Sequence, residues 1–223
     1  IQYLEAVRDA SRPEPAERAS DLVALVDANP RLRWNEDGTR LLVVTWKSQG
    51  AHDDVFRDQA RTSAREDVVV WVTTVPEAQE MCQAYVRTNP EATDAEVNLR
   101  LTQYLGLHHT WQYDVFVEMW VSPDELFRPC VDPEVTDSQC DLDFGTGTPV
   151  VENIDDYRTF YQNLYFQNFR GKPGVPWTGL GYTYDWGNPL TEQGASEFIL
   201  VPEATYQIER VVGTREYCGP RVE

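Results

Sequence analysis

Lysine is nearly absent from this sequence, and basic residues as a whole are scarce. Of the 19 basic residues only Lys47 and Lys172 are lysines, whereas 37 residues are acidic, so the formal net charge is −18. Nucleic acids and anionic membranes bind basic patches, so we expect neither of them as a partner. Cations or basic proteins suit this charge better, and adaptation to high salt is an alternative origin for it.

Long apolar runs and familiar catalytic motifs are absent as well. No run of about 18 apolar residues is present to span a bilayer. The sequence contains no GxSxG and no HExxH, and the glycines at 145–149 lack the GxGxxG spacing of a phosphate-binding loop. It also contains no Asn-x-Ser/Thr glycosylation site. The composition, 41% hydrophobic and 25% charged, is that of a folded globular protein.

Cysteines are few but even in number. Cys82, Cys130, Cys140 and Cys218 do not form the close pairs that are typical of structural zinc sites. Of the three possible disulfide pairings we favour Cys130 with Cys140 and Cys82 with Cys218. Disulfides require an oxidising compartment, so this pairing predicts a secreted, periplasmic or outer-surface protein. Four free thiols in a reducing compartment are the alternative.

The first residue bears on the same question. The chain begins at Ile1 and contains only Met81 and Met119 as methionines. We therefore expect that a signal peptide has been removed or that the chain has been shortened in another way.

Apolar periodicity, together with proline and glycine, predicts the order of elements. We expect strands at residues 32–34, 39–46, 68–75, 111–121, 196–201 and 205–212. We expect helices at residues 2–9, 14–28, 77–87, 94–105 and 154–169. Thr93 is placed to cap the helix at 94–105, and Gly106 to end it. Residues 35–38 form a hairpin turn, and residues 48–66 and 170–194 are loops, the first with one helical turn at most.

Helices and hairpins in this mixed order predict an α+β fold. We expect a mainly antiparallel sheet with flanking helices and long ordered loops, held together by the two disulfides. The chain divides into an N-terminal helical segment at residues 1–30 and a single α+β domain at residues 31–223. A length of 223 residues is enough to bury a substantial core.

The strand predicted at residues 111–121 carries two acidic side chains on one face. Asp114 and Glu118 alternate with Phe116 and Trp120, and such a face is either solvated, the more ordinary case, or the floor of a polar cleft. Glycoside hydrolysis uses two carboxyl groups about 5 to 10 Å apart. Asp114, Glu118 and Asp185 are therefore the candidates for a catalytic carboxylate pair.

The late loop at residues 170–194 combines glycine, proline and aromatic residues. Long ordered loops often carry function, and aromatic faces beside a carboxylate can stack upon and hydrogen-bond to sugar rings. The alternative is that the rings form the small core of the loop itself. The candidate ligand-binding residues are Trp177, Tyr182, Tyr184, Asp185 and Trp186.

The loop around Cys140 is rich in carboxylates, whose oxygens suit Ca²⁺. The spacing does not match a DxDxDG loop, and a solvated acidic loop is the alternative. The candidates for a weak calcium site are Asp132, Glu134, Asp137, Asp141 and Asp143. We expect no other cofactor and no histidine metal site, because adjacent side chains diverge along most backbones and the only histidines are His52, His108 and His109.

Three phrases carry a resemblance to known sequences. WVTTVPE at 71–77, LFRPCVDPEVTDSQC at 126–140 and PWTGLGYTYDWGNP at 176–189 resemble those of an uncharacterised group of secreted bacterial proteins. The similarity extends over most of residues 68–218. The resemblance implies export from a bacterial cell and brings no activity with it.

These observations favour a non-catalytic function over an enzymatic one. The first hypothesis is an exported binding or structural component of a bacterial cell envelope or extracellular assembly, with a protein or a glycan as its partner. The alternative is a glycan-active hydrolase that uses the carboxylate pair. A deep pocket lined by two carboxylates in opposed environments would favour the enzyme.

Overall fold

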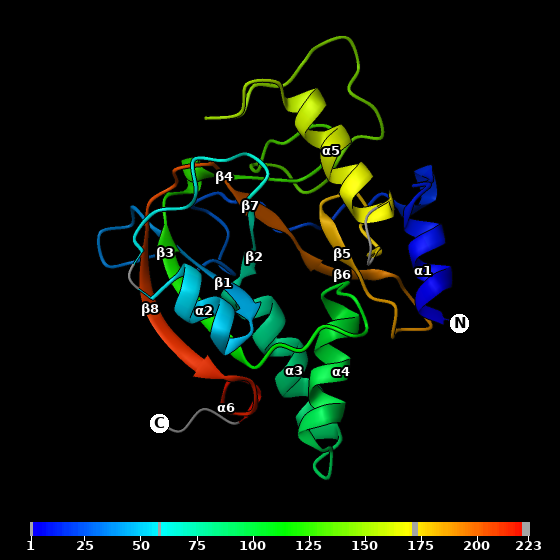
Figure 1. Cartoon of the computed structure of the whole chain (residues 1–223), viewed down its shortest axis with the longest axis vertical. Coiled ribbons are helices and arrows are strands. Elements are labelled where there is room, and N and C mark those ends of the chain that lie inside the picture. Colours follow the sequence, from blue (N-terminus) through cyan, green and yellow to red (C-terminus); the bar gives the residue numbers. More distant parts are fainter. Residues whose placement is uncertain (1, 58, 171–173, 220–223) are drawn as a thin grey trace.

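The computed structural model describes residues 2–57, 59–170 and 174–219, which form an α+β fold (Figure 1). The helices are α1 Gln2–Ala10, α2 Gln49–Val55, α3 Val75–Thr88, α4 Asp94–Tyr104, α5 Tyr157–Arg170 and α6 Thr214–Cys218, with short 3₁₀ helices η1 Pro15–Glu17 and η2 Pro123–Glu125. The strands are β1 Leu41–Lys47, β2 Val70–Thr74, β3 Val115–Val121, β4 Leu126–Phe127, β5 Tyr182–Tyr184, β6 Gln193–Ser196, β7 Phe198–Leu200 and β8 Tyr206–Gly213. Residues 171–173 of the predicted late loop and residues 220–223 of the predicted domain lie outside the described part.

Six strands form one antiparallel sheet in the order β4-β7-β2-β1-β3-β8, and β5 and β6 form a second, small sheet. The predicted α+β class with a mainly antiparallel sheet is therefore confirmed. The chain passes from the small sheet to the large one through a single residue, Glu197, which separates β6 from β7. No helix in the described ranges is long and apolar enough to cross a membrane.

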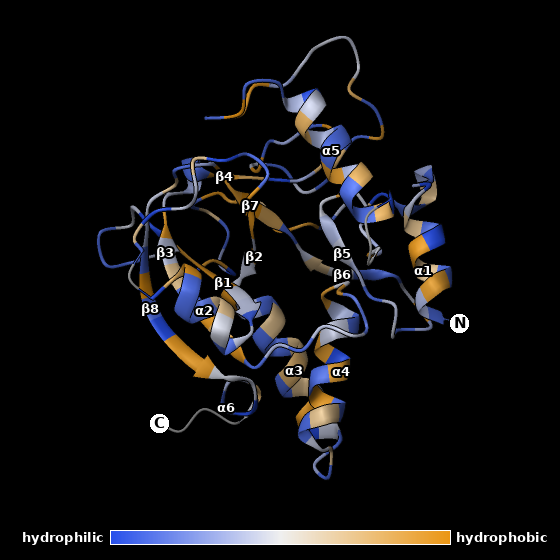
Figure 2. Cartoon of the chain, in the orientation of Figure 1, coloured by the Kyte–Doolittle hydropathy of each residue, from blue (hydrophilic) through white to orange (hydrophobic). Residues whose placement is uncertain are grey.

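Alternate residues of the central strands pack into two apolar cores, one on each face of the sheet. Leu41 and Val43 of β1 face a core that they share with β2, β3, β7 and α5. Leu42, Val44 and Trp46 face a second core formed with α3, α4 and α6. Figure 2 shows polar and apolar residues alternating along α3 and α4, as expected of helices that bury one face.

The prediction of an ordinary solvated face for the strand at 111–121 is wrong. Phe116 is fully buried and stacks on Tyr217 of α6, with ring centroids 4.0 Å apart. Glu118 is only 2% exposed. The strand also begins later than predicted, at Val115, because its partners there, Lys47 and Gly213, are the last residues of β1 and β8.

The predicted helix at residues 14–28 is also wrong. Only η1 is helical there, and the following residues run across the loop of the Cys130–Cys140 disulfide. The amide of Leu22 donates to Ser138 O at 3.0 Å, and that of Leu25 donates to Val135 O at 2.7 Å. These partners are distant in sequence, so the apolar run at 22–26 gains more from this docking than from a helix of its own.

Most other predicted elements are present with shifted ends. Thr93 caps α4, because its hydroxyl accepts a hydrogen bond from the amide of Glu96. In the predicted turn before β1, Gly38 has a positive φ of 70°. The first arm of that hairpin is reduced to a bridge between Trp34 and Leu41. Residues 49–55, expected as a loop, form α2.

Both predicted disulfides are present. Cys82 of α3 is bonded to Cys218 of α6, across 136 residues, and Cys130 is bonded to Cys140, across 10 residues. The first bond holds the last described helix against the sheet face that contains Phe116.

Candidate functional site

A cavity of about 260 Å³ lies beside the sheet, close to the lower end of the roughly 300–1,000 Å³ that small-molecule sites usually occupy. Its walls come from β1, β2 and β3, from the segment after α4, and from residues 175–177. Most of the lining is apolar. The polar side chains in it include Lys47, Thr73 and Glu197.

The end of α4 shapes one wall of this cavity. Gly106 has a φ of 61°, and the amide of Leu107 donates to Thr102 O at 2.9 Å, as in a glycine-terminated helix. This sharp turn places Leu105 and Leu107 in the cavity lining and sends the chain on to Trp111.

Aromatic rings form much of the remaining wall. Trp46 stacks on Phe116 with centroids 5.7 Å apart and meets Tyr113 edge-on at 5.4 Å. Trp71 and Trp177 meet edge-on at 6.4 Å. All five rings line the cavity, so a ligand in it would contact flat apolar surfaces on more than one side.

Glu197 is the most unusual group of the cavity. Its residue is 6% exposed, and its Oε1 atom has no hydrogen-bond partner within the described ranges. Burial raises the pKa of the Glu197 carboxyl to about 8, against a smaller lowering by the indole of Trp177. The carboxyl is therefore protonated at neutral pH, and its Oε1 atom is buried without a hydrogen-bond partner.

Lys47 contributes the basic group to the lining. It is the last residue of β1, where the register pairs it with Val115. The residue is partly exposed, but the protein around its ammonium group excludes enough water to lower the pKa of that group. None of the ion pairs in the described part of the chain includes Lys47.

Each of the three predicted catalytic carboxylates already has a partner. Glu118 accepts two bonds from Arg210, at 2.7 and 2.8 Å, and Asp185 accepts two from Arg100, at 2.6 and 2.8 Å. Asp114 accepts a bond from the amide of Gln49, at the start of α2. Asp114 and Glu118 are four residues apart along extended chain, which is roughly 13 Å and too far for a glycosidase pair.

The predicted aromatic set is divided between different parts of the fold. Trp177 lines the cavity, whereas Trp186 packs with Tyr3 in a small cluster near α1. Tyr182 is 1% exposed and donates to Glu17 O, and Tyr184 donates to Asp9 at 2.8 Å. Tyr184, Asp185 and Trp186 line one hollow of about 460 Å³ beside α1, so the structure brings three of the five residues together and places Trp177 in the other cavity.

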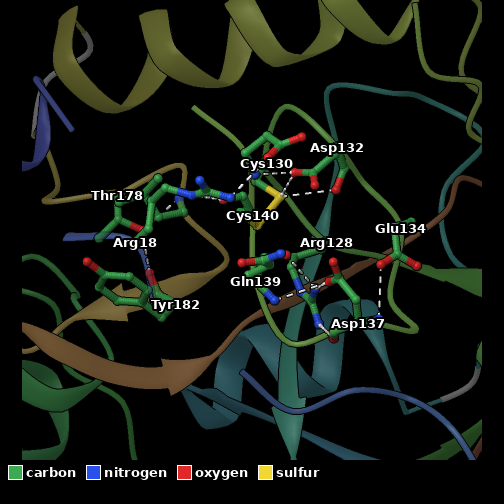
Figure 3. The surroundings of a disulfide bond; sticks show 12 residues. Arg18, Arg128, Cys130, Asp132, Glu134, Asp137, Gln139, Cys140, Thr178 and Tyr182 are labelled. Carbon is green, nitrogen blue, oxygen red and sulfur yellow. Dashed lines mark hydrogen bonds and ion pairs between the residues drawn. A yellow bond between two sulfur atoms is a disulfide. The ribbon is translucent and has the colours of Figure 1, made fainter. Parts of the chain in front are cut away.

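The loop closed by Cys130 and Cys140 is built around the guanidinium of Arg128, which is fully buried (Figure 3). Arg128 donates to the carboxylate of Asp137 at 3.0 Å and to carbonyls of Val23, Asp137 and Gln139. A Cβ on Gly181, whose φ is 78°, would lie 2.6 Å from the Arg128 side chain. Glycine is therefore required there for the late loop to pass the guanidinium.

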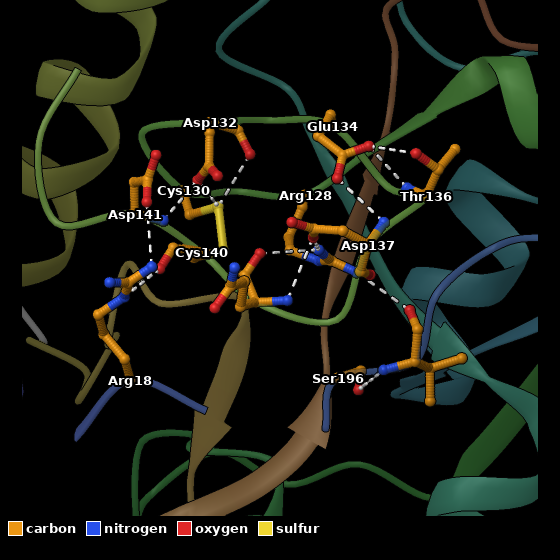
Figure 4. Close-up of polar contacts among 12 residues, drawn as sticks. Arg18, Arg128, Cys130, Asp132, Glu134, Thr136, Asp137, Cys140, Asp141 and Ser196 are labelled. Atoms are coloured by element: carbon orange, nitrogen blue, oxygen red, sulfur yellow. Dashed lines mark hydrogen bonds and ion pairs between the residues drawn. A yellow bond between two sulfur atoms is a disulfide. The ribbon is translucent and has the colours of Figure 1, made fainter. Parts of the chain in front are cut away.

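The five carboxylates predicted as calcium ligands accept bonds from internal donors rather than converging on one point, and Figure 4 labels four of them, Asp132, Glu134, Asp137 and Asp141. Asp137 pairs with Arg128, Asp141 with Arg18, and Glu134, Asp132 and Asp143 accept bonds from nearby amides. Two clusters of three potential ligands occur in the described ranges, Cys130–Asp132–Cys140 and Asp9–Glu17–Glu192, and the first contains disulfide sulfurs. The structure therefore does not bring the five predicted calcium ligands together.

The histidines are likewise separate from any such cluster. His108 and His109 stack on each other with centroids 4.6 Å apart, and both meet the ring of Tyr3 edge-on. His52 is buried in α2 beside Asp53. No cluster of potential metal ligands in the described part of the chain includes a histidine.

Two residues of the cavity were not predicted from the sequence, although each left a signal. Glu197 is the one charged residue in the apolar run from 195 to 201, and Lys47 follows the run at 41–46. A lone charge next to an apolar strand is either paired or functional.

Comparisons with known proteins bring no further assignment to this site. No family model matches the chain, and neither a curated protein nor a solved structure is similar to it.

Proposed function

We propose that the protein is an exported binding protein that holds a small, largely apolar ligand in the cavity between the sheet and residues 105–113 and 175–177. The observation that carries this proposal is the Glu197 carboxyl, which is buried in the cavity lining with one oxygen unbonded. A buried polar group without a partner costs roughly 1–3 kcal/mol. A ligand that hydrogen-bonds to it offsets that cost.

The lining favours binding over hydrolysis. Among the described residues of the cavity wall, Glu197 is the single carboxylate, and serine, cysteine and histidine are missing. Glycoside hydrolysis by the usual route requires two carboxyl groups, and acyl transfer requires a nucleophile beside a base. Aromatic walls with one polar anchor are instead typical of sites that bind a small molecule.

The two disulfides support the exported location. Cys82–Cys218 and Cys130–Cys140 are both formed, and such bonds persist in oxidising compartments.

Ligand-detected NMR with a library of small aromatic and aliphatic compounds tests this proposal on the full chain. Val175→Trp fills the cavity from its loop wall, and Leu4→Trp adds the same side chain at a position of α1 that is 70% exposed. We expect bound compounds to be lost from Val175→Trp and retained by Leu4→Trp. Compounds that bind both variants equally, or a library with no binder, would contradict the proposal.

A further inference from the structure

The surroundings of Glu197 indicate what kind of ligand the cavity accepts. Its carboxyl forms no ion pair within the described part of the chain. Other acidic groups there form ten ion pairs, each with an arginine or a histidine. The two other buried carboxylates, Glu118 and Asp185, each have a bidentate arginine. Glu197 is thus a buried acid that forms no ion pair in the described part of the chain, not even with Lys47 of the same cavity lining.

We infer that the cavity binds an organic ammonium ion with an apolar, preferably aromatic, body, and that the ligand supplies the cation missing at Glu197. This inference rests on the proposed function and specifies its ligand class. The ammonium group would donate a charge-assisted hydrogen bond to the carboxylate, while the body fills the space between the rings.

The rings beside Glu197 favour a cation over an anion. Trp71 and Trp177 both line the cavity, and their rings meet edge-on with centroids 6.4 Å apart. The faces of tryptophan rings attract ammonium groups, and this attraction is strongest where water is excluded. The net charge of −18 also draws cations to the protein and repels anions.

Three other titratable groups lie on the elements around Glu197. Tyr161 of α5 is close enough to interact with it electrostatically, and burial raises the pKa of that phenol to about 12. Glu77 of α3 accepts bonds from Ser196, the neighbour of Glu197, and lies 3.9 Å from Arg31. Lys47 lines the cavity from β1. Tyr161 is therefore neutral at pH 7, and Glu77 already has its own partners.

Binding of an ammonium ion should displace a proton. The Glu197 carboxyl is protonated in the empty site and ionised in the complex, so its proton passes to the buffer. With a pKa of about 8, roughly 0.9 proton is released per ligand at pH 7. A neutral ligand leaves the carboxyl protonated and releases none.

Isothermal titration of the disulfide-intact chain with three probes of one skeleton tests the inference. The probes are 2-phenylethylamine, 2-phenylethanol and phenylacetate, each titrated at pH 7 in two buffers that differ in ionisation enthalpy. We expect the amine to bind at least about tenfold more tightly than the alcohol, with release of about one proton, because it alone gains a charge-assisted bond and a cation–π contact.

Two variants assign the preference to the cavity. Glu197→Gln keeps the shape of the side chain but cannot ionise, so the ratio of amine to alcohol affinity should fall severalfold, to the part that the cation–π contact supplies. Glu192→Gln removes a carboxylate from the cluster of Asp9, Glu17 and Glu192, the other place where an amine could collect. We expect this control to leave the ratio unchanged.

The outcomes separate the two proposals. Equal binding of amine and alcohol, tighter binding of phenylacetate, or loss of the preference in Glu192→Gln overturns the inference and leaves the cavity as a site for apolar ligands. No binding by any of the three probes or by the NMR library overturns both. If Glu197→Gln does not fold, the probe order and the proton release of the unmodified chain still decide the question.

Discussion

Folding stability should depend on pH through Glu197. An unfolded glutamate titrates at its ordinary pKa of 4.5, whereas burial raises the pKa of Glu197 in the folded chain to about 8. Between these values the folded state holds a proton that the unfolded state has lost. The stabilisation that this proton provides is therefore complete below pH 4.5 and is lost as the pH rises to about 8.

The size of the effect follows from the difference between the two pKa values. A difference of about 3.5 pH units, at 1.36 kcal/mol per unit, corresponds to about 5 kcal/mol between pH 4.5 and pH 8. Glu197→Gln removes this titration and keeps the size of the side chain. The free energy of unfolding of the variant, minus that of the unmodified chain, should therefore rise by about 1.4 kcal/mol per pH unit across this range.

Urea denaturation from pH 4 to pH 9, with both disulfides intact, measures this difference. Subtracting the two curves cancels the titration of other acids, such as Glu77 and Glu192, whose pKa values burial also raises. Glu91→Gln, at an exposed position, is the matched control for the change from carboxylate to amide. A difference for Glu197→Gln that stays constant with pH would refute the assignment of a buried, protonated carboxyl.

Three further predictions concern the disulfides and the loop around Arg128. In urea denaturation, replacing Cys82 and Cys218 by alanine should lower the free energy of unfolding by about 5 kcal/mol, and replacing Cys130 and Cys140 by alanine should lower it by about 3 kcal/mol. The first loss is larger because that bond closes the longer loop, and equal losses would contradict this order. Arg128→Met should cost about 3–5 kcal/mol in the same assay, since it leaves Asp137 and three carbonyls without their donor; a loss under 1 kcal/mol would show that the guanidinium does not organise the loop. Millimolar Ca²⁺ should leave the Tm within about 1 °C of its value in chelator, because the loop carboxylates are engaged internally, and a larger increase would indicate a bound ion.

The parts of the fold with strong local signals could be predicted from the sequence. The cap at Thr93, the glycine after α4 and the apolar run of β2 each specify their conformation through nearby residues alone. The disulfide pairing also followed, because the Cys130–Cys140 loop is short and the other two cysteines follow a central strand and the last strand.

The parts that depend on distant partners could not be predicted. The run at 22–26 has a helical pattern, but its amides bond to residues 135 and 138, which no local pattern reveals. Glu118 has the spacing of a solvated face, but α6 covers that face and Arg210 comes from another strand. The candidate site shares this limitation, since Lys47, Trp177 and Glu197 are joined only by the folded chain.

The Cys82–Cys218 bond gives the sheet an uneven resistance to mechanical force. The two middle strands, β2 and β1, precede Cys82, whereas β4 and β7 on one side and β3 and β8 on the other lie inside the covalent loop. Tension applied at Gln2 and Gly219 passes through the sulfur atoms and bypasses residues 83–217. Only the residues before Cys82 can then extend, by at most about 290 Å. This extension pulls β1 out from between β2 and β3, while the outer strands carry no load.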